Sequence, residues 1–144
     1  MSSKIIGKPH AAWEAWHRAI EASLCGNDEV ALSELNNLLS EKVVFKAPTY
    51  FKEQASKEYT MLALQGVGKL FKDFQYTREF IGERDMALEF VCKCGPNGPL
   101  LHGIDMMKLD ENGQIVELAV LARPPSAVAA LYEHQKAFFK KAKM

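Results

Sequence analysis

Apolar residues in the first half of the chain recur every three or four positions, the spacing that places them on one face of an α-helix. The pattern predicts three helices, over residues 9–26, from about residue 27, and over residues 56–72. Residues 43–47 form a short apolar run between the second and third helices. We predict a strand there, because Pro48 directly after it cannot continue a strand ladder.

The second half of the chain alternates between apolar and polar residues, the period-two pattern of β-strands. Four strands and a last helix are predicted, over residues 74–81, 86–94, 100–109, 114–122 and from Ser126 to about 141. Glycine- and proline-rich turns join the strands, so consecutive strands pair as hairpins in a largely antiparallel sheet. The predicted class is therefore α+β, in the order helix, helix, strand, helix, four strands, helix.

Composition limits the classes of partner. The 144 residues suit one domain, residues 1–144, and 18 basic against 18 acidic residues leave no net field for nucleic acid or membranes. The N-terminal segment lacks the apolar run of a signal peptide, and no run could span a membrane. The odd count of three cysteines, Cys25, Cys92 and Cys94, argues against a disulfide framework, and the Cys92/Cys94 pair lacks a second Cys or His pair at the spacing of a zinc site. We expect a cytoplasmic protein without a metal or another cofactor.

Several segments carry a resemblance to a known family: Leu24–Asp28, Val43–Pro48, Gly103–Leu118 and Ala122–Pro124. With the order of elements, they resemble the nuclear transport factor 2-like (NTF2-like) superfamily. That group includes ketosteroid isomerase, the SnoaL-like polyketide cyclases and limonene epoxide hydrolase. The resemblance implies a sheet that curves around the N-terminal helices as a cone with a mostly apolar interior pocket. It also implies a homodimer formed through the convex face of the sheet.

The register of the strands decides which side chains would line this pocket. If Asp105 faces inward, period two sends Gly103 and Met107 the same way, and Leu118 and Val120 follow on the next strand. The alternate residues on these two strands would point to the convex face, where they would form an apolar patch that is a candidate dimer surface. It consists of Ile104, Met106, Ala119 and Leu121.

Asp105 is the leading candidate for chemistry, since it lies between Ile104 and Met106 in an otherwise buried strand. A buried carboxylate must be paired or neutral, and desolvation raises its pKa. By resemblance, Asp105 matches the protonated aspartate with which ketosteroid isomerase donates a hydrogen bond to a substrate oxygen. The alternative is a structural aspartate bonded to a tyrosine, a lysine or the backbone.

The rest of the isomerase set does not carry over. Ala47 stands where the resemblance implies the catalytic base, and the first helix has no tyrosine near Ile20. We therefore do not expect ketosteroid isomerase activity by that mechanism. The Asp-Arg-Asp set of the epoxide hydrolase is not found in a recognisable arrangement.

Other candidates have weaker support. His17 could act as a general base with Asp105 as its partner, or lie at the edge of a tryptophan stripe. Alternation places Arg78 on one side of its strand with Phe74, Tyr76 and Phe80, where it would bind a carboxylate or pair with an acidic neighbour. The candidate ligand-binding residues are Trp16, Ile20, Tyr50, Tyr59, Arg78, Phe90, Met107, Leu118 and Val120.

These patterns predict a protein that holds a small, largely apolar molecule in an interior pocket. Any chemistry would be proton transfer of the isomerase, cyclase or dehydratase type, with Asp105 as acid or donor. The alternative is a non-catalytic ligand-binding or protein-interaction module, or an accessory subunit, with the same fold.

Overall fold

The structure is a computed structural model that describes residues 3–142, in which four helices and six strands are found. The helices are α1 (Ala11–Leu24), α2 (Asp28–Leu38), α3 (Lys57–Leu70) and α4 (Pro125–Lys141). The strands are β1 (Lys4–Gly7), β2 (Leu39–Lys46), β3 (Phe71–Ile81), β4 (Asp85–Cys94), β5 (Leu100–Leu109) and β6 (Ile115–Arg123).

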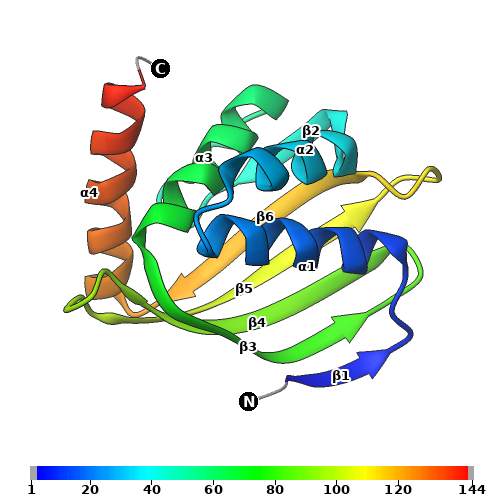
Figure 1. Ribbon diagram of the computed structural model, residues 1–144, viewed down its shortest axis with the longest axis horizontal. Helices are drawn as coiled ribbons and strands as arrows, with labels where there is room; N and C mark the ends of the chain where they lie inside the picture. The colour runs from blue at the N-terminus through cyan, green and yellow to red at the C-terminus, as the bar shows by residue number, and fades with distance from the viewer. Residues whose placement is uncertain (1–2, 143–144) are drawn as a thin grey trace.

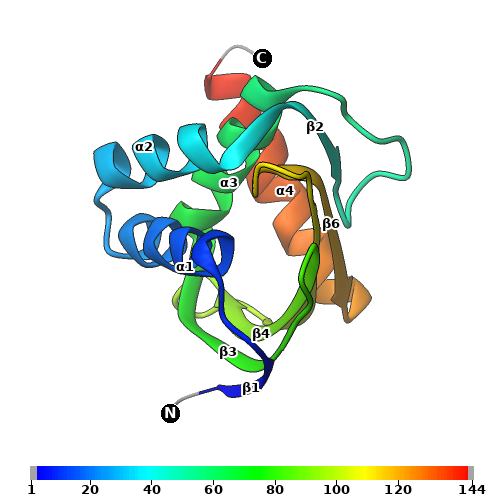
Figure 2. The same ribbon diagram turned by 90° about the vertical axis from the view of Figure 1, so that its right-hand side faces the viewer.

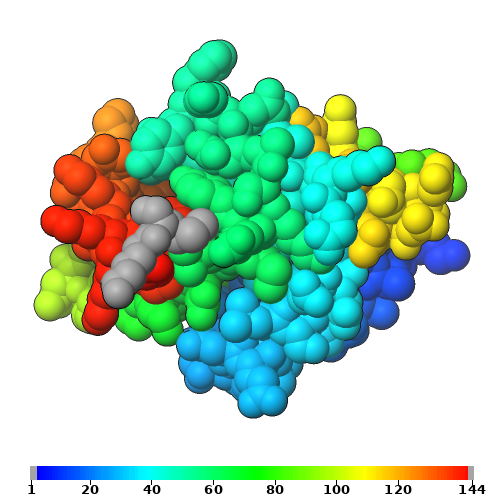
Figure 3. Space-filling view, turned by 90° about the horizontal axis from the view of Figure 1, so that it is seen from above, coloured from blue at the N-terminus to red at the C-terminus, as the bar shows by residue number. Residues whose placement is uncertain are grey.

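All six strands form one curved, open sheet in the order β1-β3-β4-β5-β6-β2. Strands β3 to β6 pair antiparallel, and the edge strands β1 and β2 run parallel to β3 and β6. The sheet bends around α1, α2 and α3, and α4 lies at one end of the curve (Figures 1 and 2). Seen from above, α4, α3 and the α2–β2 segment lie side by side (Figure 3). The predicted α+β class with a curved sheet is confirmed.

Helix starts follow local chemistry closely. The side-chain oxygen of Asn27 accepts a hydrogen bond from the Val30 N–H at 3.3 Å, and Ser56 Oγ accepts one from the Tyr59 N–H at 3.0 Å. The predicted cap at Ser126 is wrong. The N-cap is Pro124, and helix α4 begins at Pro125, two residues before the start that a cap at Ser126 implies; a proline in the first turn has no N–H that needs a partner.

Strand β1 has no counterpart among the predicted elements. Its four residues pair with the edge of β3 and are all exposed, so no apolar alternation marks them. A strand of four residues is also at the lower limit of the length over which a period of two can be detected.

A β-bulge in β3 changes the predicted facing of its side chains. Tyr76 lies opposite Phe90 but Arg78 lies opposite Glu89, so Thr77 is an extra residue in this strand. Strict alternation would keep Tyr76, Arg78 and Phe80 on one face.

The observed strand separates these side chains. Phe74 and Tyr76 face the helices, whereas Arg78 and Phe80 are exposed on the convex side. The bulge also turns Glu79 inward, where its side chain is 1% exposed. The predicted grouping of Arg78 and Phe80 with Tyr76 is therefore wrong.

The core lies between the helices and the concave face of the sheet. Trp16, Leu88, Met107 and Leu118 are fully buried there. Met107 and Leu118 face inward as the register predicted, but they pack in the core and do not line the interior cavity.

Candidate functional site

An interior cavity of about 70 Å³ lies between α1, α3, α4 and the concave face of the sheet. Most of its wall is apolar, with Trp16, Ile20, Phe90, Val120 and Leu131 among the lining residues. Its polar side chains are Ser23, Tyr76, Asp105 and the indole N–H of Trp16. The structure thus brings together five of the predicted site residues: Asp105, Trp16, Ile20, Phe90 and Val120.

Asp105 is the acidic side chain of this cavity. It lies in β5 with 8% of its surface exposed and faces the cavity, which is the orientation assumed in the predicted register. Burial raises the pKa of its carboxyl from 3.8 to about 7, and a hydrogen bond with Tyr76 acts in the opposite direction. Both protonation states are therefore populated at neutral pH, which suits a proton donor or acceptor.

Tyr76 is the polar neighbour of Asp105. Its hydroxyl oxygen accepts a hydrogen bond from the Trp16 indole N–H at 2.9 Å. Burial, followed by the negative charge of Asp105, holds the pKa of Tyr76 well above 10, so the hydroxyl keeps its proton. This O–H can donate to Asp105 or to a ligand oxygen.

Aromatic rings form one wall of the cavity. The Phe74 and Phe90 rings stack with centroids 5.0 Å apart, and Tyr76 meets Phe74 edge-on at 4.9 Å. Gly103 in β5 makes this packing possible, since a Cβ there would lie 2.5 Å from Phe90 Cζ. The wall is therefore flat and apolar beside the Asp105 carboxyl.

His17 does not reach this cavity. Its Nε2 pairs with Oε1 of Glu79, so the predicted partnership of His17 with Asp105 is not observed. The sequence analysis did not identify Glu79 as a site residue, because strict alternation along the strand gives no reason to place its side chain on the concave side of the sheet. Only the bulge at Thr77 does so, and a threonine in a strand is no signal for a bulge.

Arg78 also lies outside the cavity, on the convex face. Its guanidinium donates two hydrogen bonds to Glu89, from Nε to Oε1 at 2.7 Å and from Nη2 to Oε2 at 2.9 Å. Glu89 further accepts bonds from His102 and Thr77, and these partners, Arg78 first, hold the pKa of its carboxyl well below the usual range. The structure thus places Arg78 beside an acidic neighbour, one of the two alternatives for this residue.

The two remaining tyrosine candidates lie away from the cavity as well. Tyr59 stacks on Phe139 with ring centroids 4.8 Å apart. Tyr50 is half-exposed in the β2–α3 loop and meets Tyr132 edge-on at 5.8 Å. Neither tyrosine lines the interior cavity: Tyr59 in α3 packs against the core, and the loop that carries Tyr50 lies over the convex face.

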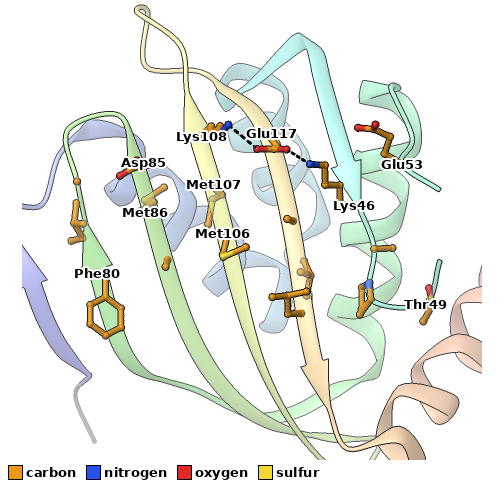
Figure 4. Close-up of a pocket in the computed structure, with 18 of the residues that line it drawn as sticks. Lys46, Thr49, Glu53, Phe80, Asp85, Met86, Met106, Met107, Lys108 and Glu117 are labelled. Atoms are coloured by element: carbon orange, nitrogen blue, oxygen red, sulfur yellow. Dashed lines mark ion pairs between the residues drawn. The ribbon is translucent and has the colours of Figure 1, made fainter. Parts of the chain in front are cut away.

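A second, larger hollow is the convex trough, about 1140 Å³ in volume, between β1 and the β2–α3 loop (Figure 4). Phe80, Met106 and Leu121 give it an apolar floor. At one end Glu117 pairs with Lys46 and, at 3.6 Å, with Lys108. Met106, Ala119 and Leu121 line this trough, in agreement with the predicted convex register.

Within residues 3–142, no group of three or more histidine, cysteine, aspartate or glutamate side chains is arranged to hold a metal ion. In the same part of the chain, every helix is too short or too polar to cross a bilayer.

The architecture and the cavity define a class of protein: an α+β cone whose curved, open sheet surrounds a mostly apolar interior. The chain belongs to the NTF2-like superfamily, as solved structures of similar sequence show. A steroid delta-isomerase from Pseudomonas aeruginosa is 31% identical, with a TM-score of 0.81 and 92% of each chain covered.

Two further structures agree. An uncharacterised protein with a cystatin-like fold from Silicibacter pomeroyi DSS-3 is 32% identical, with a TM-score of 0.74 over 90% of this chain and 92% of that one. A protein described as a SnoaL-like polyketide cyclase from Shewanella denitrificans OS-217 shares the fold at 12% identity and a TM-score of 0.59, over 87% and 99% of the two chains. No protein-family model and no curated protein matches the sequence.

Proposed function

We propose that this chain binds a small, largely apolar molecule that carries a carbonyl or hydroxyl oxygen, and that Asp105 shares a proton with that oxygen or its neighbouring carbon. The observation that carries the proposal is one carboxyl with a pKa of about 7 facing an apolar cavity. Protonated Asp105 and Tyr76 provide two O–H donors at the same end of the cavity. An apolar wall with few convergent polar groups is typical of ligand sites.

The volume of the cavity limits what can enter it. About 70 Å³ is less than half of the roughly 150 Å³ of an apolar protein cavity that accommodates benzene. A ligand therefore has only a few heavy atoms, or it places only its oxygen-bearing end in the cavity. A rigid molecule with four fused rings does not fit without movement of the walls.

Binding without catalysis is the second candidate, favoured by the lack of a second base. Among the described residues that line the cavity, Tyr76 and Asp105 are the acidic groups, and Ala47 offers no side chain for proton transfer. Catalysis would need Asp105 alone to remove a proton from a carbon beside the carbonyl group and to return it.

A thermal-shift screen of small ketones, terpenoids and aromatic acids at pH 6 tests binding. We expect a ligand at about 100 times its dissociation constant to raise the melting temperature of the wild type by roughly 5–10 °C. Asp105→Ala should lose this stabilisation. The matched control Asp85→Ala, on the neighbouring strand and outside the interior cavity, should keep it. Equal stabilisation of wild type and Asp105→Ala by every ligand would contradict the proposal.

Solvent exchange separates the two candidates. In D2O, a catalytic Asp105 would replace the hydrogens beside the carbonyl group of a bound ketone by deuterium, and NMR would record their loss. Binding with no exchange above the rate in Asp105→Asn would identify a non-catalytic binding protein.

We further propose that the chain forms a homodimer through the convex trough. Six apolar side chains around it are exposed: Ile6, Tyr50, Phe51, Phe80, Met106 and Leu121. Apolar patches of this kind are typical of interaction sites. Phe51 projects fully into solvent beside the trough, so one face offers both a protruding ring and an apolar hollow. A two-fold dimer needs such self-complementarity.

The double substitution Met106→Lys/Leu121→Lys is expected to convert the dimer to a monomer, because it places four lysines at the centre of the proposed interface. Light scattering after size-exclusion chromatography measures the mass. Val30→Lys, at a similarly exposed apolar position on α2, is the control and should remain dimeric. A wild type that is monomeric at high micromolar concentration would overturn this proposal.

A further inference from the structure

Glu79 is a buried carboxylate that the proposed site does not use. Its side chain is 1% exposed, and it lies outside the interior cavity. Oε1 accepts a hydrogen bond from the Trp13 indole N–H at 3.2 Å and pairs with Nε2 of His17. Oε2 accepts a bond from the Ser3 hydroxyl. A buried polar cluster is poor evidence for added stability, since apolar residues of similar volume often serve as well.

The cluster reaches the cavity through His17. The imidazole ring lies 4.3 Å from the Trp13 ring and 4.9 Å from the Tyr76 ring, between centroids. Phe74 packs edge-on against Tyr76 at 4.9 Å, and Trp16 binds the Tyr76 hydroxyl oxygen. A series of contacts thus runs from Glu79 through His17 to Tyr76, which lines the interior cavity together with Asp105.

Two features of the backbone create this series. Trp13 and His17 are four residues apart in α1 and therefore lie on the same face of the helix, over Glu79. The bulge at Thr77 places both Tyr76 and Glu79 on the concave side, although an odd separation in a regular strand would put them on opposite faces. Bulges are over-represented next to active sites, where they redirect side chains.

We propose that Glu79 and His17 are positioning residues for the cavity: they hold the Tyr76 ring so that its hydroxyl meets Asp105. The inference rests on the function proposed above, because it gives the pair a role only if the Tyr76–Asp105 contact serves a ligand. Glu79 fixes the imidazole, and the imidazole supports the side of the Tyr76 ring nearest to α1.

The contact has a consequence that can be measured without a ligand. The hydrogen bond from Tyr76 lowers the pKa of Asp105, so a Tyr76 ring that is no longer held should let that pKa rise. The titratable groups next to Asp105 are Tyr76 on β3 and Cys92 on β4. Burial raises the pKa of the Cys92 thiol to about 12, so it stays neutral in the relevant range.

The test follows the titration of the Asp105 carboxyl by ¹³C NMR in the full-length chain. Tyr76→Phe sets the scale, with an expected upward shift of the midpoint of about one pH unit, the effect of one hydrogen bond to a charged group. Glu79→Leu and His17→Ala should each give a substantial part of that shift. Glu79→Gln, which keeps an acceptor oxygen for Trp13 and His17, should recover at least half of what Glu79→Leu loses.

Glu89→Leu is the matched control, because Glu89 is also a glutamate in a bonded cluster but lies on the convex face. It is expected to lower stability without moving the Asp105 midpoint. If Tyr76→Phe shifts the midpoint while Glu79→Leu and His17→Ala leave it unchanged, the positioning role is wrong, although the binding function could still hold. If Glu79→Leu fails to fold, His17→Ala allows the same decision, because the His17 side chain is only partly buried. Failure of the ligand screen would overturn the proposed function alone, since the midpoint is measured on the free protein.

Discussion

Replacing Asp105 by asparagine is expected to stabilise the chain, relative to the wild type, by roughly 4 kcal/mol more at pH 9 than at pH 3. Folding raises the pKa of this carboxyl from 3.8 to about 7, so the folded state binds the Asp105 proton more tightly than the unfolded state. The stability that this proton contributes is fully present below about pH 4. It is lost as the pH rises through 7. Asparagine does not titrate, so the variant does not show this loss of stability at high pH.

Urea unfolding of both proteins between pH 3 and pH 9 measures this difference. The other titrating groups are common to the two chains, so subtracting the curves isolates Asp105. The difference should change mainly between pH 4 and pH 7 and be flat above pH 8. Asp85→Asn is the control and should show no change of this size. A constant difference at all pH values would mean that folding leaves the pKa of Asp105 at its ordinary value.

Patterns that depend on local chemistry were predictable from the sequence. The spacing of Trp13, Trp16 and Ile20 marks a helix face, and the turns around Gly95 and Gly113 separate strands of regular alternation. The shared facing of Asp105, Gly103 and Met107 followed from period two in β5, because residues 100–108 of that strand keep an unbroken register with β4. The resemblance supplied the curvature, which no single strand reveals.

The rest depended on irregularities and on distant packing. The bulge at Thr77 reverses the facing of Arg78 and Glu79, and one extra residue leaves no mark in composition. Tyr59 looks like a ligand-orienting residue in the sequence, but the C-terminal helix covers it with Phe139. His17 and Glu79 are 62 residues apart, so their pairing is a property of the tertiary structure alone.

The packing of Phe90 on Gly103 predicts strong coupling between the two positions. Phe90→Ala removes a buried ring and should cost about 3–5 kcal/mol. Gly103→Val should cost about 1–3 kcal/mol, because its Cβ would lie 2.5 Å from Phe90 Cζ and 2.9 Å from Cε1. In the double variant, valine fills part of the space that the ring leaves. Its loss of stability, from urea unfolding, should be smaller than the sum of the single losses by about 1–2 kcal/mol.

The same pair of substitutions should control the size of the interior cavity. Phe90 lines the cavity, so Phe90→Ala enlarges it beyond 70 Å³ toward the roughly 150 Å³ that accommodates benzene in an apolar protein interior. We therefore expect benzene to raise the melting temperature of Phe90→Ala but not that of the wild type or of the double variant. Additive stability losses, or equal responses to benzene in all three proteins, would mean that the Phe90 ring does not form this wall. Gly103 would then not be required for the packing of Phe90, and the small volume of the cavity would need another cause.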